Sequence, residues 1–143
     1  MFLLDTNVVS ELRKTRSGRA DPKVVAWMAD APAAALYLSA VTVLELELGV
    51  LLMERRDTTQ GLAIRRWVED RILPAFAGRI LPIDTDVARR AAALHVPDPR
   101  PDRDALIAAT ALVHGLRVVT RNIADFGPTG AAVVNPWTAP APG

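Results

Sequence analysis

The chain has 143 residues, of which 50% are hydrophobic and 23% charged, and its formal net charge is +1. This length suits one domain, and a net charge near zero indicates no particular class of partner. The absence of cysteine excludes disulfide scaffolds, Cys-ligated metals and thiol catalysis. Asp5 interrupts the first apolar run, so we expect no signal peptide. No apolar run is long enough to span a membrane, and we expect a cytoplasmic protein.

Short apolar runs alternate with amphipathic segments through the first half of the chain. Runs typical of buried strands occupy 2–4 and 36–38. Asp21 and Pro22 form a helix cap followed by a favoured first residue, so a helix opens there. A basic loop over 15–19 precedes it. The pattern predicts further helices over 8–13, 39–54 and 61–73.

The second half of the chain repeats this alternation. Asp84 is expected to cap a helix that ends near His95, and a proline-rich loop follows over 96–103. The next helix is expected over 104–113. The apolar runs predict strands at 79–83, 116–120 and 131–134.

Strands that alternate with helices predict parallel βαβ units. We therefore expect an α/β fold, a three-layer α/β/α sandwich with a mostly parallel sheet of four to five strands. Residues 1–135 are predicted to form the single domain, and residues 136–143 a proline-rich, partly disordered tail. In such sheets ligands bind beyond the carboxyl ends of the strands.

Four carboxylates lie where apolar runs end or within the helices that follow: Asp5, Glu45, Asp104 and Asp125. Buried carboxylates are costly unless they are paired or bind metal. With no cysteine and two histidines in the chain, four such acids indicate one site for a hard cation.

Glu45 is placed by helical spacing within an apolar stripe. The residues of that stripe are Val41, Leu48 and Leu52, flanked by Leu44 and Leu51. A glutamate among these residues either binds a cation or pairs with one of the arginines, and the pattern leaves both interpretations open.

Each of the three aspartates also has a purely structural interpretation. Asp5 fits a helix N-cap. Asp104 suits the first turn of a helix, where its charge stabilises the macrodipole, with Asp102 as the cap and an alternative ligand. Asp125 and Asn122 resemble a capping box. Taken alone, each residue fits either interpretation.

Together the four acids favour metal binding, because a parallel sheet brings its strand ends to one edge. Oxygen ligands suit Mg²⁺ or Mn²⁺, ions that stabilise in-line phosphoryl displacement and activate water. Mobile cations beside such a site can hold the phosphate groups of a substrate. The candidates for that role are Arg13, Lys14, Arg16 and Arg19. A solvated run of charge explains the same four residues equally well.

Several stretches in order resemble a known family: FLLDTNVVSEL, LSAVTVLELELG, and DALIAATALVHGLRVVTRNIADF followed by VVNPW. They are similar to the PIN-domain family and, within it, to the VapC-type toxic ribonucleases of bacterial type II toxin–antitoxin pairs. The closing VVNPW resembles the branch that includes FitB-like members.

The resemblance implies a metal-dependent endoribonuclease with a parallel α/β/α fold and a cofactor of Mg²⁺ or Mn²⁺. It places the site on Asp5, Glu45, Asp104 and Asp125. Some branches of the family carry the fourth acid where this chain has Asn122, so we assign it to Asp125. The residues expected to support the carboxylates are Thr6, Asn7, Thr120, Asn122 and Asp102.

The resemblance also implies partners: an RNA substrate, a cognate VapB-like antitoxin whose C-terminal segment fills the cleft, and a second copy of the chain. For the homodimer interface we expect Trp27, Leu52 and Trp67. Two other functions stay open at this point. One is a catalytically idle PIN-like module that binds RNA or protein, and the other is a phosphatase-like hydrolase with the same metal chemistry.

Overall fold

The computed structural model describes residues 1–138 and contains a five-stranded sheet with the strand order β3-β2-β1-β4-β5. Every neighbouring pair of strands is parallel, as the sequence predicts. The strands are β1 (Phe2–Leu4), β2 (Leu36–Ser39), β3 (Ile80–Leu81), β4 (Arg117–Val119) and β5 (Val133–Val134).

Helices separate the strands in the expected alternation. They are α1 (Thr6–Arg13), α2 (Pro22–Asp30), α3 (Ala40–Arg56), α4 (Thr58–Trp67), α5 (Leu73–Ala75), α6 (Thr85–Leu94), α7 (Asp102–His114) and α8 (Ile123–Phe126). Short segments η1 (Ala33–Ala35), η2 (Val68–Ile72) and η3 (Gly127–Thr129) complete the described chain. The η2 turn is π-helical and joins α4 to α5.

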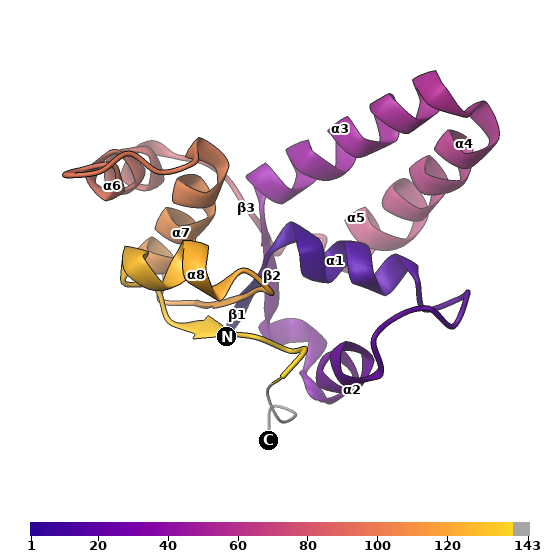
Figure 1. Cartoon of the computed structure of the whole chain (residues 1–143), viewed down its shortest axis with the longest axis horizontal. Coiled ribbons are helices and arrows are strands. Elements are labelled where there is room, and N and C mark those ends of the chain that lie inside the picture. The colour runs from indigo at the N-terminus through magenta and orange to yellow at the C-terminus, as the bar shows by residue number, and fades with distance from the viewer. Residues whose placement is uncertain (139–143) are drawn as a thin grey trace.

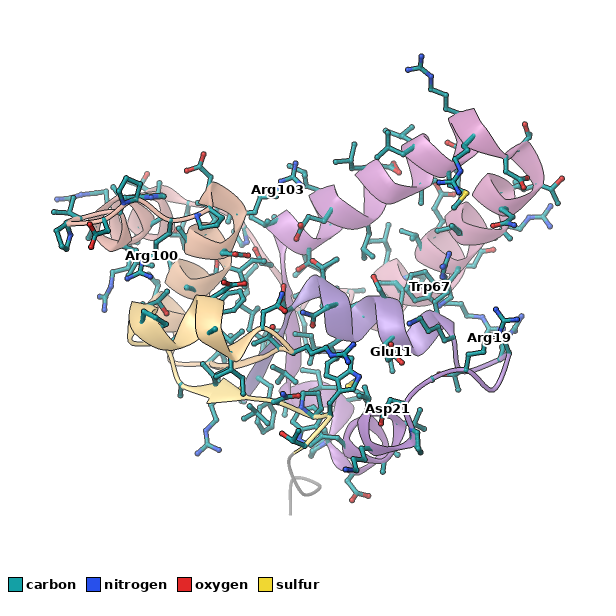
Figure 2. The ribbon with its side chains drawn as sticks, in the orientation of Figure 1. Glu11, Arg19, Asp21, Trp67, Arg100 and Arg103 are labelled. Carbon is teal, nitrogen blue, oxygen red and sulfur yellow. The ribbon has the colours of Figure 1, made fainter. Side chains whose placement is uncertain are left out.

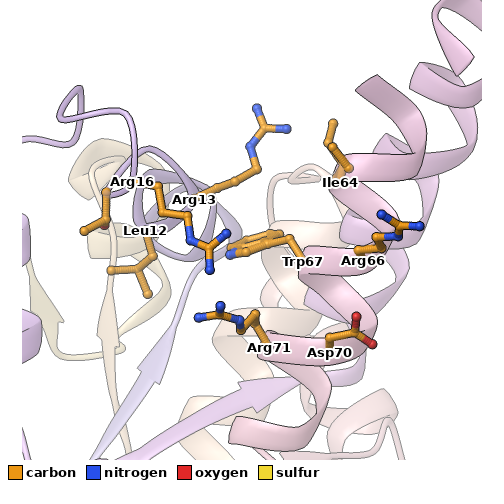
Figure 3. A pocket seen from close by; sticks show the side chains of 10 residues that line it. Leu12, Arg13, Arg16, Ile64, Arg66, Trp67, Asp70 and Arg71 are labelled. Atoms are coloured by element: carbon orange, nitrogen blue, oxygen red, sulfur yellow. The ribbon is translucent and has the colours of Figure 1, made fainter. Parts of the chain in front are cut away.

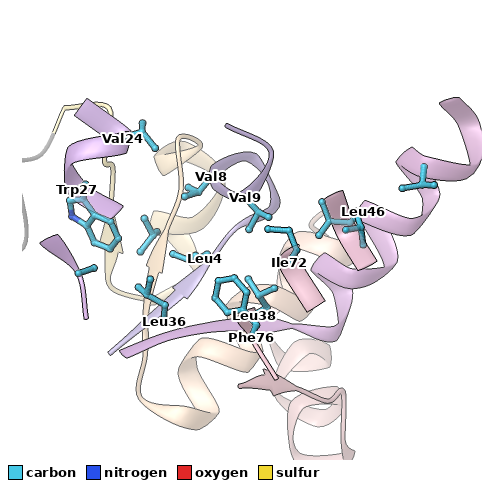
Figure 4. Close-up of a cluster of buried hydrophobic side chains, with 14 residues drawn as sticks. Leu4, Val8, Val9, Val24, Trp27, Leu36, Leu38, Leu46, Ile72 and Phe76 are labelled. Carbon is cyan, nitrogen blue, oxygen red and sulfur yellow. The ribbon is translucent and has the colours of Figure 1, made fainter. Parts of the chain in front are cut away.

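Helices cover both faces of the sheet, which confirms the three-layer sandwich (Figure 1). Leu4 faces the layer that contains α1 and α2, whereas its neighbour Leu3 faces α7. This alternation follows from the two-residue period of a strand. On the first face Trp27 is fully buried in the cluster of apolar side chains drawn in Figure 4. Its ring packs edge-on against Phe2, with ring centroids 4.9 Å apart. Full burial of such side chains contributes about 1.5–3 kcal/mol each.

Capping side chains fix where the helices begin. Asp21 accepts a hydrogen bond from Lys23 N–H, and Asp84 accepts one from Val87 N–H, as the sequence predicts. The fourth helix starts earlier than expected, because Asp57 caps it by accepting from Gln60 N–H. The third strand is shorter than expected and spans Ile80–Leu81.

Helices α3 and α4 form a hairpin that extends away from the sheet (Figure 1). A Cβ atom on Gly61 would lie 2.5 Å from Glu54 Cα, so only glycine permits this close approach. Arg65 of α4 joins the two helices through ion pairs with Glu47 and Glu54 of α3, and it also pairs with Glu69 of η2.

The proline-rich tail begins as a turn in the described part of the chain. Trp137 N–H donates to Asn135 Oδ1, and the indole packs against the core. Arg121 lies over the indole ring, 5.2 Å from its centroid. Residues 139–143, the rest of the predicted tail, lie outside the described residues, and the domain boundary at 135 stays a prediction. Within residues 1–138, no helix has both the length and the apolar character needed to cross a membrane.

Candidate metal centre

Asp5 lies at the carboxyl end of β1, where it is 5% exposed. Its Oδ1 accepts the Thr6 N–H at 2.8 Å, so one oxygen does cap α1. Its Oδ2 accepts from the Thr120 hydroxyl at 2.8 Å and from Asn7 Nδ2 at 3.2 Å. The cap is therefore only part of its role, because three residues from two elements fix the orientation of this carboxylate.

Thr120 directly follows β4, bonds to Asp5 and connects several of the predicted residues. Its oxygen accepts the Asn122 backbone N–H at 3.0 Å and a hydrogen from Asn7 Nδ2 at 3.3 Å. Thr120 is completely buried, so these bonds restrict its hydroxyl hydrogen to Asp5. The structure thus brings Thr120, Asn7 and the backbone of Asn122 together behind Asp5.

Glu45 reaches the same edge of the sheet from the second turn of α3. The Thr6 hydroxyl donates to Glu45 Oε1 at 2.7 Å. The other oxygen, Oε2, lies 3.7 Å from Arg103 Nη1. The arginine pairing left open by the sequence is present, but it is long, and the carboxylate remains 27% exposed.

The expected burial of Glu45 within a leucine stripe is wrong. The buried residues of α3 are Val41, Thr42, Leu46 and Val50. The leucines assigned to the stripe are instead exposed by 36–60%: Leu44, Leu48, Leu51 and Leu52. Apolar residues surround most of this helix, so spacing alone does not reveal which face meets the core. Glu45 lies at the border of the buried face and points toward Thr6.

Asp104 lies in the first turn of α7 and is partly buried. Burial raises the pKa of its carboxyl, and the negative charges of Asp5, Asp125 and Glu45 raise it further. Asp102 differs, because its side chain is 90% exposed and lies 3.4 Å from His95 Nε2. The interpretation of Asp102 as the helix cap is wrong, because Pro101 occupies the cap position and no side chain caps this helix. Its roles as an alternative ligand and a supporting residue stay predictions.

Asp125 lies on α8, the short helix that follows β4, and is exposed. The capping-box interpretation is wrong, since the Asn122 side chain makes no capping hydrogen bond. The charge of Asp125 raises the pKa values of Asp5 and Asp104. Asp125 is therefore near enough to both to repel them.

The pKa of Asp5 is raised chiefly by burial, against the lowering effect of its bonds from Thr120 and Thr6. Glu45 and Asp125 add to the rise by charge repulsion. Four mutually repelling carboxylates favour a cation at this edge of the sheet. Within residues 1–138, no three acidic or histidine side chains form a ready-made ligand cluster. The donor set nevertheless fits Mg²⁺ or Mn²⁺, which keep several waters and need only one or two carboxylates.

The predicted basic residues lie at the opposite end of α1 from Asp5. The helix has eight residues, so they begin about 12 Å from Asp5. Lys14 is committed to an ion pair with Glu11 at 3.0 Å. Glu11 also accepts the Asp21 backbone N–H, the main cause of its lowered pKa, and thereby holds both ends of the basic loop.

Arg13 and Arg16 line a groove of about 680 Å³ between α1 and α4 (Figure 3). We call it the arginine groove. Its other wall includes Trp67, Arg66 and Arg71. Arg19 lines a smaller neighbouring hollow with Arg13 and Lys14.

Sequence reasoning missed the arginine groove and Arg103. The adjacent arginines at 65 and 66 were a visible signal, but the sequence does not say that Arg65 pairs with glutamates while Arg66 faces the groove. No local signal marks Arg103, because its partner lies on a different helix.

Comparison with known proteins relates this chain to a family. The PIN domain matches residues 2–126. VapC ribonuclease Y4jK of Sinorhizobium fredii is 41% identical over 145 residues, which cover 96% of this chain and 98% of that protein. Toxin FitB of Neisseria gonorrhoeae is 43% identical over 143 residues, or 96% of this chain and 99% of the toxin.

A solved structure shows the same architecture. The crystal structure of FitAcB from Neisseria gonorrhoeae superposes with a TM-score of 0.88 and 40% sequence identity. The match covers 97% of this chain and all of that one. Sequence and fold agree over nearly the whole length, and the chain belongs to the PIN-domain family.

Proposed function

We propose that this chain is a metal-dependent endoribonuclease and the toxin of a type II toxin–antitoxin pair. The observation that carries the proposal is the set of carboxylates beside Asp5, whose orientation is fixed by Thr120, Asn7 and Thr6. Membership of the PIN-domain family, with relatives named as a VapC ribonuclease and a toxin, supports the activity and the role.

The proposed metal is Mg²⁺ or Mn²⁺, held by Asp5 and Asp104 with Glu45 and Asp125 completing the acidic site. When bound, the ion supplies charge stabilisation for phosphodiester hydrolysis and activates water. The chain's own residues position these ligands. Thr120 fixes the rotation of Asp5, and Thr6 holds Glu45.

The RNA backbone is proposed to contact the arginine groove and the basic loop beyond it. The guanidinium groups of Arg13, Arg16 and Arg19 are available to bind phosphates, whereas the Lys14 ammonium is already paired with Glu11. Such contacts position the strand without reading its sequence.

RNA cleavage by the purified protein tests the activity. We expect cleavage with Mg²⁺ or Mn²⁺, none with excess chelator, and none from Asp5→Asn, which keeps the side-chain shape but removes the charge. Binding without cleavage would indicate an idle module. Hydrolysis of a small phosphomonoester without RNA cleavage would indicate the phosphatase-like alternative.

The proposed partner is a VapB-like antitoxin whose C-terminal segment covers the carboxylates. An arginine supplied by that segment would neutralise Asp5 and Asp104 and compete with metal. Induced expression in the cytoplasm, the proposed location, should arrest bacterial growth. Asp5→Asn should remove the arrest, and co-expression of the neighbouring gene should relieve it. Harmless wild-type protein in the native host without the antitoxin would refute the toxin role.

A homodimer remains part of the proposal, with a corrected surface. Trp27 was expected at the interface, but it is 1% exposed and belongs to the core. The exposed leucines of α3 offer a more suitable face, which we call the leucine face: Leu44, Leu48, Leu51 and Leu52. A helix face of this kind can pair with its own copy about a two-fold axis.

A further inference from the structure

Arg103 occupies the mouth of the acidic site, between the start of α7 and the first turns of α3 (Figure 2). It immediately precedes Asp104 in the chain, and its Nη1 lies 3.7 Å from Glu45 Oε2. Among residues 1–138, it is the one cation that forms an ion pair with any of the four carboxylates.

The contact with Glu45 is too weak to give Arg103 a structural role. Half of the side chain is exposed, and 3.7 Å is too long for a hydrogen bond. Ion pairs of this kind contribute little to stability. Within the described residues, the guanidinium makes no hydrogen bond.

Other arginines of this chain show what a structural role looks like. Arg79 donates to Leu36 O at 2.9 Å and to Ala75 O. Arg100 donates to Leu94 O at 2.9 Å and to Pro128 O at 3.3 Å. Both side chains link separate segments, whereas the donors of Arg103 stay available at the site.

We propose that Arg103 binds a phosphate of the RNA at the acidic site and exchanges Glu45 for that phosphate when the substrate enters. The inference rests on the proposed ribonuclease function and adds a substrate-binding residue to it. It also separates this contact from the arginine groove, which lies at the far end of α1.

The chemistry of the site favours this exchange. A phosphodiester that approaches four carboxylates meets repulsion unless a cation offsets it. The guanidinium has a planar fork of donors that matches two phosphate oxygens. The ion pair with Glu45 is long and exposed, so breaking it costs Arg103 little free energy. Glu45 retains its bond from the Thr6 hydroxyl when Arg103 leaves.

RNA affinity measured in chelator tests the proposal, because binding can then be followed without cleavage. Fluorescence anisotropy with a labelled single-stranded RNA is recorded across a salt series for wild type, Arg103→Gln and Arg103→Lys. Arg90→Gln is the matched control, since Arg90 is an exposed arginine on α6. Thermal unfolding of each variant establishes that it is folded.

We expect Arg103→Gln to weaken binding and to reduce the slope of log affinity against log salt by about 0.7, the loss of one phosphate contact. Arg103→Lys should keep the slope but bind less tightly than wild type, because it retains the charge without the fork. Arg90→Gln should match wild type. With Mg²⁺ or Mn²⁺, the cleavage rate at limiting RNA should be lower in Arg103→Lys than in wild type and lowest in Arg103→Gln.

An unchanged affinity and salt slope in folded Arg103→Gln would overturn the role of Arg103 while leaving the ribonuclease proposal intact. A lower unfolding temperature with an unchanged slope would assign the residue a structural role instead. A wild-type protein that neither binds nor cleaves RNA would overturn the ribonuclease function, and the inference with it.

Discussion

Thr6 donates its hydroxyl hydrogen to Glu45 Oε1 over 2.7 Å, across 39 positions of sequence. Its backbone N–H donates to Asp5 Oδ1 at 2.8 Å. One residue therefore bonds two of the four carboxylates. The relative placement of Asp5 and Glu45 depends on this residue at the start of α1.

Thr6→Val should reduce metal affinity and cleavage by about 10-fold to 100-fold, the usual effect of losing a residue that orients a ligand. The variant keeps the shape of the side chain and the backbone bond to Asp5, and it loses the hydroxyl's bond to Glu45 and its contact with the Thr42 hydroxyl. Titration calorimetry with Mn²⁺ and single-turnover cleavage measure the two effects. Thr6→Ser retains the hydroxyl and is expected to retain activity. Equal activity of the Val and Ser variants would count against the bridging role.

Asp104→Asn should lower cleavage by about 100-fold or more, because the variant removes a charge from the metal site. The matched control is Asp102→Asn, two positions away on the same helix, where the side chain is 90% exposed. We expect near wild-type cleavage from the control. Initial rates at several Mg²⁺ concentrations decide the matter, and similar losses in both variants would contradict the assignment.

The raised pKa of Asp104 predicts how stability responds to pH without metal. Its folded-state pKa lies above the unfolded one, so its ionised carboxylate destabilises the fold near neutral pH. Asp104→Asn should therefore unfold at a higher temperature than wild type in chelator near neutral pH. The difference should shrink as pH falls through the raised pKa and vanish below the unfolded value of about 4, where wild-type Asp104 is protonated in both states.

In the presence of metal, wild type should unfold at a higher temperature than Asp104→Asn. Mg²⁺ or Mn²⁺ that binds only the folded state stabilises wild type in proportion to the logarithm of its concentration. We expect this gain to be lost in Asp104→Asn and to weaken in wild type at low pH, because protons compete for the ligands. Thermal unfolding in metal and in chelator supplies the comparison. Destabilisation of Asp104→Asn in chelator at neutral pH would show that burial and repulsion of the Asp104 charge do not dominate its effect on stability.

Charge reversal in the arginine groove should weaken RNA binding without changing the metal site. Arg13→Glu and Arg16→Glu are each expected to lower the salt slope of binding by about 0.7 or more. Mn²⁺ affinity should stay unchanged, since the groove lies at the far end of α1, about 12 Å from Asp5. An exposed arginine on α6, Arg89, provides the control as Arg89→Glu. If all three variants bind alike, the basic run is merely solvated charge.

Polar substitution of the leucine face should shift a homodimer toward monomer. Leu52 is 60% exposed, and Leu52→Asp would introduce a charge near its copy across a two-fold axis. Sedimentation velocity over a range of protein concentrations measures the shift. Val96→Asp is the control, because Val96 is 76% exposed in a loop. A dimer that survives in Leu52→Asp uses another surface.

The architecture was largely predictable because it rests on local signals. Apolar runs such as 2–4 become strands, and Asp21 and Asp84 start helices where capping rules place them. The position of Asp5 followed from the same logic, since a residue after a parallel strand must lie at the carboxyl edge of the sheet.

Features that depend on contacts between distant elements were not predictable. The buried face of α3 passes through Thr42 and Leu46 rather than through the leucine face, because the elements packed against the helix decide which side is covered. Asp102 and Asp104 look equivalent in sequence, yet their side chains leave the helix in different directions. The Arg103–Glu45 pair joins two helices whose separation no local pattern encodes.

The close approach at Gly61 makes the width of the arginine groove a property of the helical hairpin. Any larger residue there must displace α4 from Glu54, and with it the groove wall that carries Trp67. The hydrogen bonds to the Asp5 carboxylate come from Thr6 and Asn7 of α1 and from Thr120 just after β4, outside the hairpin. Substitutions in α4 can therefore change the width of the groove while leaving the bonds that orient Asp5 in place.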